Sequence, residues 1–437
     1  MNKTIKGACL VAATAMLPLS QAATAGEVNI SGWVNEAMTY YDDGQGSDVV
    51  QSSDNGATLN SRITFTGSAD AGSTGMKAGF EITMEPTNGF NSGALGGVTP
   101  LLTATQANFS DDNGFAESVS LLASNLWLSG GFGKVTLGTQ SMPTDNIAVL
   151  DDPSATLWTN VAPVFRLTGF TMRGLGAGAG AGNWGSFLQC LNTAALAIGI
   201  DCNGIYRNGI RYDLPTFAGI DIAVGYSNDD IYDIAAKYKT SLAGLNASLS
   251  LGYSINQGGS GTSSVANGIL NGGAVGANIG SGSFAGTNET EMFAMQVGLM
   301  DPATGIFGAI SYQREDAETT LATLSDDNNS WYFKGGIKRD FNSLGATSIH
   351  GSYGSYNDQF GTAGTTTGAG VDGSEVERLS FGVTQYIGSQ LQIYGTWEQL
   401  DLDVDCAGTA AVVTACNAQY AGVEELDMFS LGAVFFF

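Results

Sequence analysis

The residues of this sequence that could catalyse a reaction are few, and their spacing matches none of the common active sites. His350 is the only histidine, and Ser348 and Ser352 are its neighbours on the same strand face. A serine and a histidine two residues apart could suggest a hydrolase, but such pairs are common by chance and no nucleophile-elbow motif is visible. The glycine-rich run 174–182 imitates a phosphate-binding loop, but no lysine follows it. We therefore expect no enzyme activity.

The cysteines beyond Cys9 form two close pairs. Cys190 is twelve positions from Cys202, and Cys406 is ten positions from Cys416. A zinc site would need CxxC spacing or nearby histidines, and the sequence has neither. In an oxidising compartment such pairs predict two loop disulfides.

Acidic clusters raise the question of a bound metal. Asp42-Asp43 and Asp111-Asp112-Asn113 could hold Ca²⁺ together with lipopolysaccharide phosphates. Neither cluster has the spaced ligand pattern of a calcium loop. We expect no cofactor, and loop-bound Ca²⁺ stays open as the alternative.

The elements that must position these residues are β-strands. In the last stretch, 424–437, every second residue is apolar: Phe429, Leu431, Ala433, Phe435 and Phe437. A period of two with one apolar face predicts a half-buried strand. Membrane lipid can cover that apolar face while the strand closes a barrel against the first strand.

About sixteen such segments follow one another, joined alternately by short turns and long loops. An even number returns both chain ends to one side, as outer-membrane barrels require. The fold we predict is all-β, a transmembrane antiparallel β-barrel. A soluble sandwich would show the same alternation, so periodicity alone does not decide. The expected strands are 27–41, 59–69, 76–84, 121–129, 134–140, 206–213, 219–227, 231–239, 245–255, 290–300, 306–315, 330–341, 346–357, 377–387, 391–400 and 424–437.

The N-terminus predicts export. Lys3 and Lys6 precede an apolar run, 8–19, and Ala23-Thr24-Ala25 is an A-x-A cleavage site. We expect residues 1–25 to be a signal peptide and residues 26–437 to be the mature barrel. Removing the two lysines leaves 14 Lys and Arg against 41 Asp and Glu, a net charge of −27. So acidic a chain argues against nucleic-acid binding and favours a vestibule that attracts cations.

Four motifs indicate a family. They are EVNISGWV, SRITFTGSA, LSGGFGKVTLG and YRNGIRYDLPTFAGI. With the terminal Phe437, the mature chain resembles the Gram-negative general porins over essentially its whole length. The resemblance implies a trimeric sixteen-stranded barrel in the cell outer membrane, whose third external loop folds inward and narrows the pore. That loop would follow Gln140, where the period-two pattern stops, and we assign it to region 141–205.

The resemblance also implies a constriction with opposed charges. In the loop, Asp145, Asp151 and Asp152 would form the acidic side. On the wall, Arg62 and Arg207 match basic positions by motif, and Arg211 points inward by strand phase. Trp33 and Asn125 stand where the family often carries Lys or Arg, which weakens the basic side and favours cations. Four further basic residues could compensate: Lys77, Arg166, Arg173 and Lys237.

The favoured hypothesis is therefore passive diffusion of small hydrophilic solutes and ions. Two alternatives stay open: a substrate-selective channel, favoured by the length of 141–205, and a non-conducting adhesion or structural barrel with glycine-rich loops. The expected partners are outer-membrane lipid and lipopolysaccharide, identical subunits in a trimer, and the barrel-assembly machinery, which would read Phe437.

Overall fold

A computed structural model places most of the chain, and the expected signal peptide lies outside the described part. The residues described are 27–51, 61–72, 75–87, 118–148, 153–159, 172–176, 184–188, 206–227, 230–257, 287–319, 327–359 and 370–437.

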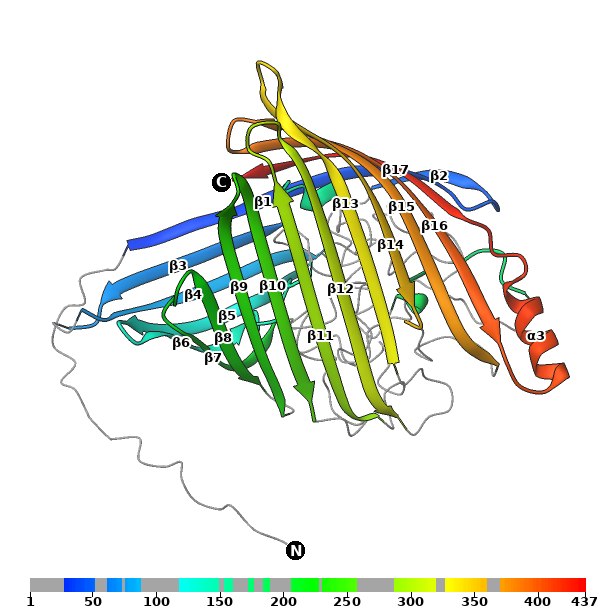
Figure 1. The fold of residues 1–437 in the computed structure, drawn as a ribbon, viewed down its shortest axis with the longest axis horizontal. Coiled ribbons are helices and arrows are strands. Elements are labelled where there is room, and N and C mark those ends of the chain that lie inside the picture. The colour runs from blue at the N-terminus through cyan, green and yellow to red at the C-terminus, as the bar shows by residue number, and fades with distance from the viewer. Residues whose placement is uncertain are drawn as a thin grey trace, which may run out of the picture.

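Within that part of the chain, seventeen strands form one antiparallel sheet, in which consecutive strands lie side by side (Figure 1). They are β1 (Glu27–Asp42), β2 (Ser47–Gln51), β3 (Arg62–Asp70), β4 (Lys77–Thr87), β5 (Ser118–Gly130), β6 (Gly133–Gln140), β7 (Arg207–Asp213), β8 (Ile220–Ser227), β9 (Ile231–Leu242), β10 (Leu245–Asn256), β11 (Thr287–Met300), β12 (Ile306–Thr319), β13 (Asp327–Asn342), β14 (Gly345–Asn357), β15 (Val371–Ile387), β16 (Leu391–Cys406) and β17 (Leu426–Phe436).

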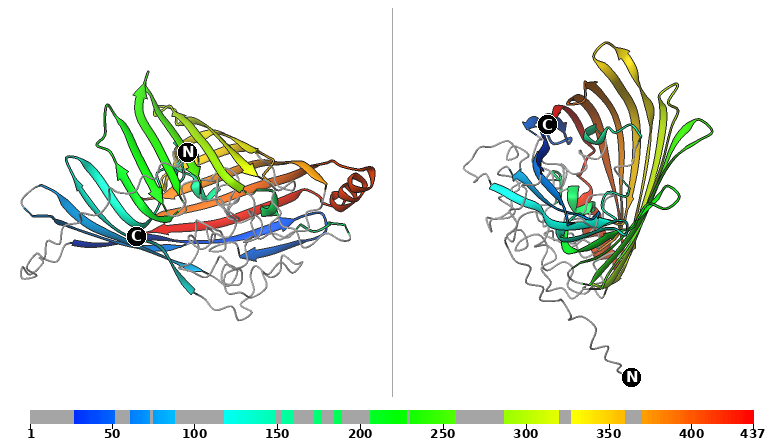
Figure 2. Two further views of the ribbon diagram at one scale, coloured as in Figure 1. Left: turned by 90° about the horizontal axis from the view of Figure 1, so that it is seen from below. Right: turned by 90° about the vertical axis from the view of Figure 1, so that its left-hand side faces the viewer.

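The first strand closes the barrel. One edge of β1 pairs with β17, from Trp33 opposite Phe436 to Asp42 opposite Asp427. The other edge pairs with β3 near its start and with β2 near its end. Because β2 and β3 follow one another along the same edge, they are two pieces of one barrel strand. The wall therefore has sixteen strands, as predicted, and it curves round on itself (Figure 2).

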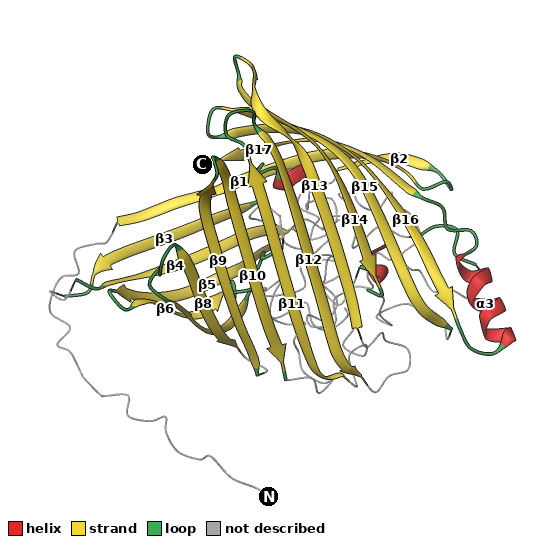
Figure 3. Ribbon diagram, viewed as in Figure 1, coloured by secondary structure: helices red, strands yellow, loops and turns green. Residues whose placement is uncertain are grey.

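The two ends of the barrel differ in their connections. At one end the chain turns within a few residues, for example at 243–244 between β9 and β10 and at 343–344 between β13 and β14. Both the start of β1 and Phe437 lie at this end. The other end carries the long connections, including 141–206 and the segment with helix α3 (Ala410–Tyr420). Figure 3 shows α3 beyond the end of β16.

Burial in this barrel is the inverse of burial in a soluble protein. The outward side chains are apolar and exposed, as with Leu126 at 66% and Leu431 at 67%. Inward side chains on β12, such as Ser311, Gln313 and Glu315, are polar and fully buried. A soluble sandwich would place its apolar residues between two sheets and its polar ones outside. Lipid outside and water inside explain the observed pattern.

The last long connection contains a helix and a disulfide. Helix α3 begins after Thr409, whose hydroxyl oxygen accepts a hydrogen bond from the Val412 N–H. Cys416 on this helix is bonded to Cys406 at the end of β16, which confirms one predicted disulfide. Cys190 and Cys202 lie outside the described residues. Among the described helices, none is long and apolar enough to cross a membrane.

Candidate functional site

The third long connection begins with residues 141–148, and these contact the inner face of the wall at three points. Arg211 on β7 donates to the Ser141 carbonyl (3.1 Å). The Asp233 carboxylate on β9 accepts from both the N–H (3.0 Å) and the hydroxyl (2.6 Å) of Thr144. Further along, the Gln296 amide on β11 donates to the Ala148 carbonyl (3.0 Å). The segment therefore lies along the wall from β7 to β11.

Two wall glycines permit this close approach. A Cβ on Gly225 of β8 would lie 2.6 Å from the Met142 Cε, and one on Gly252 of β10 would lie 3.0 Å from the Thr144 Cγ2. These are shorter than ordinary carbon–carbon contacts of about 3.5–4.0 Å. A larger residue at either position would push the segment away from the wall.

The second described segment, 153–159, is held by cations. Lys334 on β13 donates to the hydroxyls of Ser154 (2.9 Å) and Thr156 (2.5 Å). Lys338, four residues further along β13 on the same face, donates to the Ser154 carbonyl (2.8 Å). The Tyr386 hydroxyl on β15 donates to the same carbonyl (2.8 Å). Because Ser154 is fully buried, these bonds fix the segment against β13 and β15.

His350 has a structural contact in this segment. Its Nε2 lies 3.3 Å from the Thr159 hydroxyl, which itself donates to the Thr156 carbonyl (3.2 Å). The neighbouring Trp158 packs edge-on against Trp33 of β1, with ring centroids 5.9 Å apart. The two loop segments together thus contact the inner wall from β7 round to β15 and on to β1.

The carboxyl group of Asp145 is buried close to the basic residues of the wall. It accepts a hydrogen bond from the Ser141 hydroxyl (2.5 Å). Burial raises the pKa of Asp145 to about 6, while the Ser141 hydrogen bond and the charges of Lys237, Arg62 and Arg211 act in the opposite direction. The structure therefore brings Asp145 within electrostatic reach of two predicted constriction arginines.

Both of those arginines have acidic partners that were not predicted from the sequence. Arg62 is paired with Glu85 of β4 at 2.6 Å and lies 4.3 Å from the Trp33 ring centroid. Arg211 is paired with Asp213 two residues along its own strand, at 2.7 Å. Glu85 shares the inward phase of Glu81 and Thr83, so the alternation along β4 could have identified it. Arg207 is buried on the same face of β7 as Arg211.

Of the other predicted charged residues, Arg173 lies elsewhere and five fall outside the described part of the chain. Asp151, Asp152 and Arg166 fall outside the described residues, as do Asp111 and Asp112. Arg173 does not join the lumen cluster: it pairs with Asp43 beyond the end of β1, at 2.5 Å. That contact engages one of the carboxylates proposed for Ca²⁺. In the described part of the chain, no three His, Cys, Asp or Glu residues are grouped so as to hold a metal ion.

A buried ion pair on β15 and β16 was not predicted from the sequence. Arg378 on β15 and Glu398 on β16 meet at 2.5 Å, with side-chain exposures of 2% and 1%. The Arg378 guanidinium lies 5.9 Å from the Tyr332 ring centroid. Both residues have the inward phase, but their pairing depends on register between strands.

Comparison with known proteins agrees with this geometry. The sequence matches the Gram-negative porin family over residues 8–405. No curated protein matches it. An anion-selective porin from Comamonas acidovorans has a similar structure, with 20% identity, a TM-score of 0.51, and coverage of 94% of this chain and 100% of that chain. The trimer form of in-vitro folded OmpT, an outer membrane protein of Vibrio cholerae, matches with 11% identity, a TM-score of 0.50 and the same coverage.

At these identities the structural likeness concerns the fold alone, whereas the family match spans most of the sequence. The closed sixteen-stranded wall, the polar lumen and the lipid-facing apolar surface agree with it. Family and fold together indicate a channel in the outer membrane and not an enzyme. The chain belongs to the Gram-negative porin family.

Proposed function

We propose that this porin allows small hydrophilic solutes and ions to diffuse passively, with a preference for cations. The aqueous path would run between the third external loop and the wall formed by β1 to β7. The observation that supports this path is the placement of the loop contacts. Segments 141–148 and 153–159 are hydrogen-bonded to inward residues from β7 to β15. The loop would therefore fold into the lumen and narrow it.

Charge across that path would select the solutes. Asp145 on the loop faces a wall that carries Arg62 and Arg211, and opposed charges across a narrow aqueous slot create a transverse field. Such a field orients dipolar solutes and disfavours apolar ones, which must displace ordered water.

The preference for cations rests on the balance of charge. The whole chain has a formal charge of −25, and Arg62 and Arg211 are each paired with a carboxylate. The Comamonas acidovorans porin is described as anion-selective. Selectivity depends on the side chains that line the lumen, and an identity of 20% does not imply that the two proteins share them.

Reversal potentials in a salt gradient across a planar bilayer test this proposal. We expect Asp151→Asn with Asp152→Asn to shift the reversal potential toward anions, because two negative charges leave the loop. Glu377→Gln is the matched control, since its carboxylate lies on the outer face and accepts from the Tyr353 hydroxyl. An unchanged potential in the double variant would remove this part of the loop from the selectivity filter.

A substrate-selective channel is the second candidate. Loop residues form an apolar cluster with inward residues such as Tyr332 and Val376, and the loop members are Ile147, Ala148, Met172, Trp184, Phe187 and Leu188. An apolar surface inside a wet lumen could bind part of one solute. Conductance that saturates with a single solute would support this candidate, whereas large ohmic steps support diffusion.

The partners proposed for the chain are identical subunits in a trimer, outer-membrane lipid with lipopolysaccharide, and the barrel-assembly machinery. A trimer form is known for the structurally similar OmpT. For assembly, Phe437 presents an exposed ring, and its backbone exchanges two hydrogen bonds with Gly32 (3.0 and 3.1 Å).

Deleting Phe437 tests the assembly proposal. We expect less assembled trimer, because the terminal aromatic and the two bonds to Gly32 are lost, and unchanged export across the inner membrane. Heat-modifiable mobility on gels measures the first, and removal of the signal peptide measures the second. Phe435→Ala is the control for loss of an outward ring. A normal trimer yield after the deletion would contradict the role of Phe437.

A further inference from the structure

Three glycines lie side by side on the outer face of the wall. Gly308 of β12 pairs with Gly335 of β13, and Gly335 pairs with Gly351 of β14. A Cβ at any of the three would meet nothing closer than 3.7 Å. Tight packing therefore does not require glycine here, and the row leaves a gap in the surface that faces lipid.

Bulky side chains border this row on both sides along the strands. The outward residues two positions nearer the long-loop end pair with one another across β11 to β15, and they are Val297, Ile310, Phe333, Tyr353 and Leu379. The outward residues two positions nearer the short-turn end pair across β12 to β15, and they are Ile306, Ile337, Ile349 and Val383. The glycine row is thus the floor of an apolar groove that crosses the strands.

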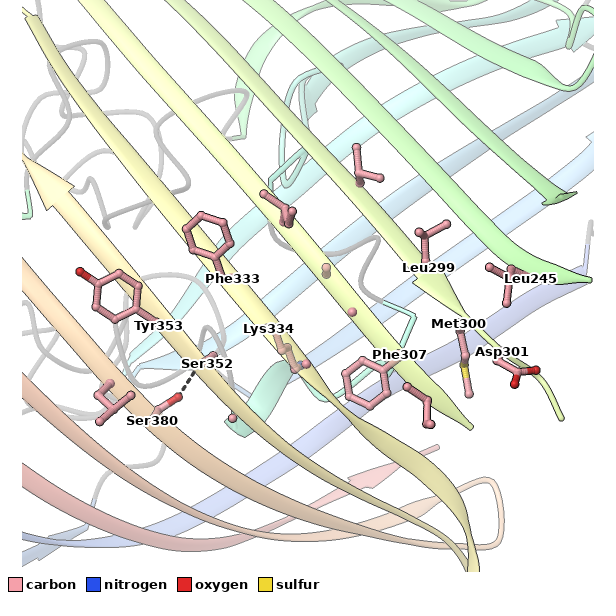
Figure 4. Close-up of a pocket in the computed structure, with 18 residues that line it drawn as sticks. Leu245, Leu299, Met300, Asp301, Phe307, Phe333, Lys334, Ser352, Tyr353 and Ser380 are labelled. Carbon is pink, nitrogen blue, oxygen red and sulfur yellow. Dashed lines mark hydrogen bonds between the residues drawn. The ribbon is translucent and has the colours of Figure 1, made fainter. Parts of the chain in front are cut away.

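The groove has a volume of about 760 Å³ and ends at a carboxylate. Figure 4 shows Tyr353 and Ser380 toward one end, and Leu245, Met300 and Asp301 at the other. Asp301 belongs to the turn between β11 and β12. Hydrogen bonds from the Thr304 hydroxyl and the Ala303 N–H lower the pKa of Asp301, so this end is anionic at neutral pH.

A cation lies on the same outer face nearer the short-turn end. Arg339 is four residues from Gly335 along β13, about 13 Å at 3.3 Å per residue. It is exposed, and its guanidinium lies 5.8 Å from the ring centroid of Phe341, which is also exposed. An arginine beside an aromatic ring is typical of the depth at which lipid headgroups meet the hydrocarbon.

We propose that this groove binds one acyl chain of a zwitterionic glycerophospholipid with a primary ammonium headgroup. The chain would lie on Gly308, Gly335 and Gly351, the ammonium group would contact Asp301, and the phosphate would contact Arg339. An unbranched chain suits a groove one residue wide. The charges also match in sign, because Asp301 is an anion and Arg339 is a cation on the same outer face. The inference rests on the outer-membrane barrel and not on the proposed ion preference.

The test is native mass spectrometry of the purified full chain in detergent, with added dioleoyl phosphatidylethanolamine. We expect a retained lipid on the natural protein and at least a fivefold lower occupancy for Gly335→Leu, whose side chain fills the groove. Gly395→Leu is the matched control: Gly395 faces outward on β16 in a smaller apolar hollow whose described lining residues are all uncharged, and a Cβ there would meet nothing closer than 3.8 Å. Gly308→Leu repeats the test should Gly335→Leu not fold, as judged by heat-modifiable mobility.

Equal lipid retention by Gly335→Leu and Gly395→Leu would overturn the proposal. So would loss of the trimer in Gly335→Leu with the lipid retained, since the groove would then receive a second copy of the chain. Dioleoyl phosphatidylglycerol, which lacks the ammonium group, tests the headgroup contacts. We expect phosphatidylglycerol to bind the natural protein more weakly than phosphatidylethanolamine does. In Asp301→Asn, we expect the two lipids to bind equally well. No preference in the natural protein would refute the role of Asp301.

Discussion

Two of the described segments of the third loop differ in their charged wall partners: 141–148 contacts a carboxylate as well as Arg211, and 153–159 contacts two ammonium groups. Segment 141–148 hydrogen-bonds to the carboxylate of Asp233, whereas segment 153–159 hydrogen-bonds to the ammonium groups of Lys334 and Lys338. The first segment also carries its own acid, Asp145, and the second offers only hydroxyl and carbonyl oxygens to its lysines. Variants at the wall can therefore perturb the two halves of the loop separately.

The largest effect is expected at the lysines. Lys334→Ala with Lys338→Ala removes three charge-assisted hydrogen bonds to a buried segment, each of which is worth about 1.5–3 kcal/mol, although such effects do not add fully. We expect a loss of about 3 kcal/mol in the free energy of unfolding and noisier single-channel currents. Lys134→Ala, beside the Trp127 ring, is the control. Quiet currents and unchanged stability would show that 153–159 is fixed by other contacts.

A smaller effect is expected at the acidic contact. Asp233→Ala leaves the N–H and hydroxyl of buried Thr144 without their acceptor, which costs about 1–3 kcal/mol in the free energy of unfolding. Asp233→Asn keeps one acceptor oxygen and should lose less. Urea denaturation measures both variants. If Asp233→Ala destabilised more than the double lysine variant, the order of strength inferred for the two segments would be reversed.

The smallest effect is a change in selectivity with pH. Because the pKa of Asp145 is about 6, its charge develops between about pH 5 and pH 7, and the reversal potential should move toward cations as pH rises. In the unfolded chain this carboxyl group loses its proton near pH 4. Its contribution to the free energy of unfolding therefore falls as pH rises from about 4 to 6 and is constant above that range. Asp145→Asn should lack the step in reversal potential. A step that persists in this variant would show that another group causes it.

Alternation along single strands was enough to predict the individual strands of the wall and their inward faces, although not that they close into a barrel. The sequence placed the start of β7 at Tyr206 and of β14 at Ala346, each within one residue of the observed start. The same alternation puts Lys334, His350 and Glu398 on the polar face of their strands, and all three are buried there. Strand phase is a local property, because side chains alternate between the two faces whatever the strand pairs with.

Features that depend on other parts of the chain were missed. The short strand β2 falls between the expected strands 27–41 and 59–69 and was not predicted, because SDVVQ has too few residues to show a period. Helix α3 (AAVVTACNAQY) contains β-branched residues and no apolar stripe, and Thr409 was its main local signal. The contacts of Ser154 join residues about 180 positions apart or more, and no local pattern predicts them.

The disulfide between Cys406 and Cys416 has a consequence for attack from outside the cell. Loops exposed beyond a barrel are the usual sites of proteolytic nicking. A cut anywhere in 407–415 would leave both new chain ends joined through the sulfur bridge, so β17 would stay covalently attached to the rest of the barrel. Such damage would separate the fragments on a gel only after reduction and unfolding.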